Sequence, residues 1–150
     1  MRFSLTVAAV AAITGSSLAA APAEAAGTVT VGATAGVAWK SYTWEHDLHA
    51  GDCTLFGGAT WTIRADGTAS FQGTVTSSDR NDAWLMRAFL KNSSNVSLVP
   101  LYNQAHDVAD WKVFAQNLPD PRLRYDFSRS ASYDKRVFDQ VSTMGLLNDC

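Results

Sequence analysis

One stretch of the chain, residues 44–53, concentrates the side chains that could do chemistry. It reads Trp-Glu-His-Asp-Leu-His-Ala-Gly-Asp-Cys and brings two histidines, three carboxylates and a cysteine into ten positions. Imidazole and carboxylate groups bind divalent metals, and they also serve as acids and bases in hydrolysis. An extended chain places His46 and His49 on opposite faces, so a shared ligand requires a turn. The stretch predicts either a metal or hydrolase loop, with His46, His49 and Asp52 as the metal candidates, or a loop whose side chains cap backbone groups.

Aromatic residues next to polar loops form a second group of candidates. A β scaffold can present a Trp or Tyr ring to a sugar, a cell-wall polymer or another protein. The alternative for each ring is a place in the core, which is where most large aromatic side chains lie. Together with the polar residues of the first stretch, they give the candidate ligand-binding residues Tyr42, Trp44, His46, Asp47, His49, Tyr102 and Trp111.

The sequence offers little for a nucleophilic mechanism. No Ser stands in a Gly-x-Ser-x-Gly elbow, and both cysteines are expected to be oxidised. We therefore favour a non-catalytic binding module over an enzyme, without catalytic residues and without a cofactor. A secreted inhibitor or toxin-like protein is a further alternative, because the segment Asn117–Arg124 contains two prolines and is stiff enough to contact a protein partner.

The N-terminal residues predict export. Arg2 is followed by the short apolar run Phe3–Ile13, and Ala23-Glu-Ala25 is a small-x-small cleavage motif, so residues 1–25 are interpreted as a signal peptide. Cleavage after Ala21 or Ala19 is the alternative. We expect a secreted, extracellular and monomeric bacterial protein that has no membrane segment once the signal is removed. The net charge of −2 and the pI near 5.8 argue against nucleic acid as a partner.

The remaining chain predicts one β domain over residues 37–150, preceded by residues 26–36 as a flexible arm or weak edge strand, of which we favour the arm. Trp61 and Ile63 alternate with polar residues up to an Asp-Gly turn, after which Phe71 and Val75 alternate in the same way. Residues 83–91 predict a central strand, with a helix as the alternative. The fold class is mainly β, an antiparallel sandwich or a small up-and-down barrel of about seven or eight strands, with one short helix near residues 132–141.

The two cysteines, Cys53 and Cys150, are expected to form a disulfide, since an even number of cysteines in an exported protein is usually oxidised. Such a bond would fix the end of the chain to the candidate loop. It would also close a long loop, which in the chain-entropy description contributes about 4 to 5 kcal/mol.

Four blocks of sequence resemble a family of small secreted actinobacterial proteins of unknown function. The blocks are residues 44–53, residues 61–71 with the Asp-Gly turn, residues 75–84 with Val-Thr-Ser-Ser-Asp and Asp-Ala-Trp, and the closing segment from Phe138-Asp to Cys150. The resemblance covers nearly the whole mature chain. It implies export, a single domain and the disulfide, and it carries over no catalytic residues.

Overall fold

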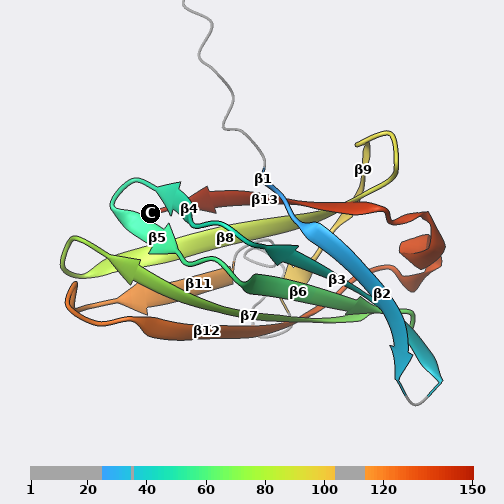
Figure 1. The fold of residues 1–150 in the computed structure, drawn as a ribbon, viewed down its shortest axis with the longest axis horizontal. Coiled ribbons are helices and arrows are strands. Elements are labelled where there is room, and N and C mark those ends of the chain that lie inside the picture. The colour runs from blue at the N-terminus through green and yellow to red at the C-terminus, as the bar shows by residue number, and fades with distance from the viewer. Residues whose placement is uncertain (1–24, 35, 104–113) are drawn as a thin grey trace, which may run out of the picture.

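Two antiparallel β sheets pack face to face in a computed structural model that describes residues 25–34, 36–103 and 114–150. The strands run mostly along the long axis of the molecule (Figure 1). The larger sheet contains β2 (Thr28–Thr34), β3 (Val37–Trp44), β4 (Leu48–Ala50), β5 (Cys53–Leu55), β6 (Ala59–Arg64), β7 (Thr68–Ser77), β10 (Tyr102–Asn103) and β12 (Tyr125–Ser132). The smaller sheet contains β1 (Ala25–Ala26), β8 (Asp82–Lys91), β9 (Ser97–Pro100), β11 (Phe114–Leu118) and β13 (Thr143–Asp149). The short 3-10 helix η1 spans Lys135–Gln140.

The core lies between the sheets and is built largely from aromatic rings. Trp61 on β6 meets Phe114 on β11 edge to face, with the ring centroids 5.0 Å apart, and so joins the two sheets. Phe71 contacts Trp61 on one side and Phe127 on the other. Burying a large aromatic side chain contributes about 1.5 to 3 kcal/mol, and edge-to-face pairing adds specificity of packing. In β6 and β7, buried residues alternate with hydroxyl residues, so each of these two strands has one face in the core and one towards solvent.

The structure confirms the predicted hairpin between β6 and β7. Trp61 pairs with Phe71 and Ile63 pairs with Ala69, and all four side chains are buried. The Asp-Gly turn closes through a hydrogen bond from Gly67 N–H to the Arg64 carbonyl, and Gly67 has a φ of 93°. That conformation suits glycine because it has no Cβ.

The central strand and the short helix are also confirmed. β8 lies between β13 and β11 in the smaller sheet, and its alternate residues Trp84, Met86, Ala88 and Leu90 are buried in the core, whereas Arg87 on the other face is exposed. Asp134 caps η1 by accepting a hydrogen bond from the Arg136 N–H, and Phe138 turns into the core. A capping acid at this place is the usual start of a helical turn.

Three of our expectations need correction. The sandwich is observed, and the barrel alternative is wrong, because the larger sheet ends at β2 and β10 without closing on itself. The described residues also form more strands than the seven or eight that we expected, because several of the strands are only two to four residues long. Residues 28–34, which we assigned to a flexible arm, form edge strand β2, paired with β3 over its full length. Small side chains do not prevent this pairing, because the ladder uses backbone groups only.

The predicted signal peptide covers residues 1–25, of which residues 1–24 lie outside the described part of the chain and Ala25 belongs to β1. Within the described residues, no helix has both the length and the apolar character needed to span a bilayer.

Candidate functional site

The outer side of the larger sheet is a continuous polar surface, which we call the hydroxyl face. Strand register aligns its side chains in two rows across β2, β3, β6, β7 and β12, because each pair of partners points to the same side of the sheet. The rows are Thr28, Thr43, Thr60, Gln72 and Ser128, and Thr30, Ser41, Thr62, Ser70 and Ser130. On β3, β6 and β7, the residues between the two rows are Tyr42, Trp61 and Phe71, which lie in the core.

Hydrogen bonds between neighbouring strands order part of this face. The hydroxyls of Ser41 and Thr62 lie 2.6 Å apart, and those of Thr43 and Thr60 lie 2.9 Å apart. Threonine has restricted χ1 rotation and suits a pleated strand, so each pair holds its oxygens at a defined place. The result is a regular array of groups that both donate and accept hydrogen bonds.

An aromatic side chain stands in the next row of the same surface. Trp39 on β3 pairs with Gly32 on β2, and a Cβ on Gly32 would come within 2.4 Å of Trp39 Cζ2. The indole therefore lies across the bare backbone of Gly32. Its Nε1–H donates a hydrogen bond of 3.1 Å to Thr34 Oγ1, which fixes the ring in this position. Trp39 is half-buried, so the ring keeps part of its surface in contact with solvent.

A shallow depression of about 350 Å³ opens beside this ring. Its lining consists of Thr34, Val37, Trp39, Ser41, Thr62 and Arg64. Arg64 is the β6 partner of Trp39, and its backbone carbonyl accepts hydrogen bonds from Tyr133 Oη–H and Gly67 N–H. The depression thus combines one apolar ring, one guanidinium and hydroxyl groups on a rigid sheet. This is the composition of a site that binds a polar ligand having apolar faces.

The disulfide between Cys53 and Cys150 is present, as predicted, and it joins β5 to the end of the chain. The carboxylate of Asp82 lies beside it, with Oδ2 at 3.0 Å from Cys150 Sγ and 3.5 Å from Cys53 Sγ. Ser77 Oγ–H donates a hydrogen bond of 2.7 Å to the same carboxylate oxygen. The potential ligand atoms of Cys53, Asp82 and Cys150 lie within 4.8 Å of one another. Because disulfide sulfurs are not thiolate ligands, this oxidised cluster is not a metal site.

The loop of residues 44–53 does not assemble the predicted metal or hydrolase site. His46, Asp47 and Asp52 are exposed, and His49 on β4 points its Nδ1 to Thr54 Oγ1 at 3.0 Å. Asp47 accepts a hydrogen bond of 2.8 Å from Gly57 N–H, which is the capping role offered as the alternative. Across residues 25–34, 36–103 and 114–150, the only convergent set of at least three His, Cys, Asp or Glu side chains is the one at the disulfide.

The predicted aromatic candidates divide three ways. Tyr42 and Trp44 lie in the core with 0% and 3% of their surface exposed, so neither presents its ring to a ligand. They alternate out of phase with Trp39, because β3 directs even-numbered residues inward here. Tyr102 is 37% exposed and lies on β10. Trp111 falls outside the described residues.

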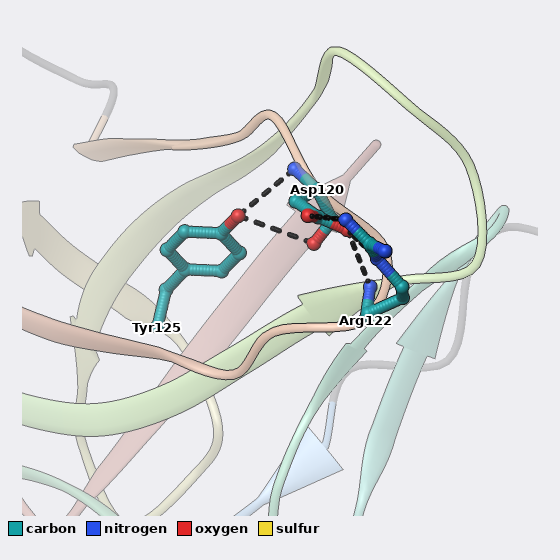
Figure 2. A network of polar contacts seen from close by, with 3 residues as sticks. All are labelled: Asp120, Arg122 and Tyr125. Carbon is teal, nitrogen blue, oxygen red and sulfur yellow. Dashed lines mark hydrogen bonds and ion pairs between the residues drawn. The ribbon is translucent and has the colours of Figure 1, made fainter.

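The Asn117–Arg124 segment contains a self-braced turn (Figure 2). Tyr125 Oη–H donates to the Asp120 carbonyl at 3.1 Å and accepts from the Asp120 N–H at 2.9 Å. The Asp120 carboxylate accepts hydrogen bonds from the Arg122 backbone and from both Nε and Nη2 of its guanidinium. These hydrogen bonds from Arg122 hold the pKa of Asp120 well below its usual range. Leu123, whose N–H donates a hydrogen bond of 3.2 Å to the Asp120 carbonyl and closes the turn, is 52% exposed.

Two residues of interest escaped our sequence-based reasoning. Trp39 shares its strand phase with Ser41 and Thr43, and that phase was the signal for an outward ring. The position of Asp82 next to the disulfide had no signal in the sequence, because it depends on how β5, β8 and β13 meet.

The fold and site define a two-sheet antiparallel β domain tied by one disulfide. The chain belongs to a family of unknown function (DUF6294), whose model matches residues 60–150. Cys53 thus precedes the matched region, whereas Cys150 closes it. No curated protein and no solved structure matches the chain.

Proposed function

We propose that the protein is an exported, non-catalytic binding module whose hydroxyl face binds a neutral glycan. One observation carries the proposal: Trp39 is held against Gly32 beside a depression lined by hydroxyl groups and Arg64. Sugars combine apolar C–H faces with a rim of hydroxyls. An indole ring can pack against the C–H face of a sugar. Ordered Thr and Ser hydroxyls and a guanidinium group can form hydrogen bonds with the sugar hydroxyls.

The charges on this surface favour a neutral ligand. Within strands β2, β3, β6, β7, β10 and β12, the charged side chains in the outward phase are Arg64 and Asp126, of opposite sign. Lys40 belongs to the inward phase, where its Nζ donates to the carbonyls of Phe138 and Val141. A surface with balanced charge has no field that collects a strongly charged polymer.

The test is isothermal titration of soluble glucan, xylan and mannan with the full mature protein and its variants. We expect binding to at least one polymer and a loss of about thirtyfold for Trp39→Ala, because truncating an anchoring Trp costs about 2 kcal/mol. Gly32→Ala should also weaken binding, since the new methyl displaces the indole without removing it.

Val31→Ala is the matched control, because Val31 lies on the same strand in the opposite phase and is 66% exposed. It should bind as the wild type does. If no polymer binds, or if Trp39→Ala binds normally, the proposed function is wrong.

A second candidate function is contact with a protein partner through the Asn117–Arg124 turn. The specific observation is that Arg122 and Tyr125 hold Asp120 in place (Figure 2). Leu123, which follows in this turn, is 52% exposed. Rigid loops bind with a small loss of conformational entropy. In a pull-down from the protein's natural surroundings, Leu123→Asp should lose a specific partner that Val31→Ala retains. Equal capture by both variants would exclude this role.

A further inference from the structure

We propose that the ligand is a single, extended chain of a neutral polysaccharide that runs across the strands from Trp39 to Tyr102. This inference rests on the proposed function, because it names the ligand class of the same face. It starts from a second aromatic ring on the hydroxyl face, at the edge opposite β2.

Strand register places the two rings in one row. Trp39 pairs with Arg64 across β3 and β6, while Thr68 pairs with Ser132 across β7 and β12, and Ser132 pairs with Tyr102 on β10. Arg64 is the last residue of β6 and Thr68 is the first residue of β7, so the two sets of pairs continue across the β6–β7 turn as one row. Asn103, the neighbour of Tyr102, is buried opposite Ala131, which confirms that Tyr102 is in the outward phase.

The length of the row sets the size of the ligand. From β3 to β10 there are four strand steps. At about 4.8 Å per step, the strands that carry the two rings are about 19 Å apart. That distance exceeds a single sugar and requires several linked units. The groups between the rings, namely Arg64, Thr68 and Ser132, provide hydrogen-bonding partners along the way.

The twist of the sheet favours a single polysaccharide chain over the flat surface of a crystalline polysaccharide as the ligand. Neighbouring strands rotate by about 20 to 25°, and Figure 1 shows β2 running steeply across the view while β12 is nearly horizontal. The two rings therefore do not share a plane. A flat crystalline polysaccharide would meet one ring and miss the other, whereas a flexible chain can follow the twisted row.

The experiment titrates the mature protein with oligosaccharides from disaccharide to hexasaccharide of the glucan, xylan and mannan series. It also measures retention on crystalline cellulose and on amorphous cellulose. We expect affinity to rise with chain length and then level off, and retention to favour the amorphous polymer. Tyr102→Ala should weaken the hexasaccharide about tenfold and leave the disaccharide unchanged. Trp39→Ala should weaken both.

The outcomes separate the two claims. Binding that depends on Trp39 but not on chain length or Tyr102 would overturn the extended ligand and keep the proposed function. Stronger retention on crystalline cellulose would also overturn it. If no saccharide binds, both claims fail. Thermal melts of each variant show that lost binding does not reflect unfolding, and Tyr102→Phe, which keeps the ring, should restore long-chain binding.

Discussion

Removing the disulfide should cost more stability than any single contact in the fold. The perturbation is the double variant Cys53→Ala with Cys150→Ala, which opens a loop with a sequence separation of 97. In the chain-entropy description a loop of this size contributes about 4.7 kcal/mol. Because β13 still pairs with β8 along its length, the variant should fold to the same structure.

Urea unfolding followed by tryptophan fluorescence measures this loss. With a slope of about 2 kcal/mol per molar urea, the midpoint should fall by about 2 M. The slope itself should rise, since the unfolded chain without the cross-link exposes more surface. The wild type under a non-thiol reductant should reproduce the variant. A loss below about 1 kcal/mol would refute the reasoning, because it would mean that the sheet alone fixes the end of the chain.

Three further predictions concern single side chains. Tyr42 Oη is buried without a hydrogen-bond partner among the described residues. Tyr42→Phe should therefore leave the free energy of unfolding unchanged, or raise it by up to about 1 kcal/mol, in urea unfolding experiments. A clear loss of stability would show that the hydroxyl has a partner. Hydrogen bonds from Arg136 lower the pKa of Asp134 to about 2, so this acid stabilises the fold above about pH 4 and loses that effect as pH falls towards about 2. Melting temperatures across this range should therefore fall less for Asp134→Asn than for the wild type, and an equal fall would count against the pairing. The Asp82 carboxylate should repel a thiolate that approaches Cys150 Sγ. Asp82→Asn should therefore speed reduction of the disulfide by glutathione about three- to tenfold in a thiol-release assay. An unchanged rate would show that the carboxylate does not protect the disulfide from reduction.

The regular part of the fold could be predicted from the sequence because its patterns are local. Alternation at Trp61, Ile63, Phe71 and Val75 together with an Asp-Gly turn determines a hairpin and its buried face. The cysteine pair followed from the number of cysteines and the expected export. The edge strand β2 was only the alternative to the flexible arm that we favoured, because its small side chains carry no periodic signal and its stability comes from pairing with β3.

The candidate site was harder to predict because it depends on which face each strand turns outward. Tyr42 and Trp44 were candidates owing to their position beside a polar loop, yet the pleat directs both inward. Trp39 faces outward and packs on Gly32, a contact between residues on neighbouring strands. Tyr102 joins the same surface only through register with β12, which one sequence does not specify.

One calorimetric comparison tests whether Trp39 binds the ligand. Soluble glucan, xylan and mannan are each titrated into the mature wild type, Trp39→Ala and Val31→Ala. At least one polymer should bind the wild type and Val31→Ala equally and bind Trp39→Ala about thirtyfold more weakly. Equal binding to all three proteins, or no binding to any, would contradict it.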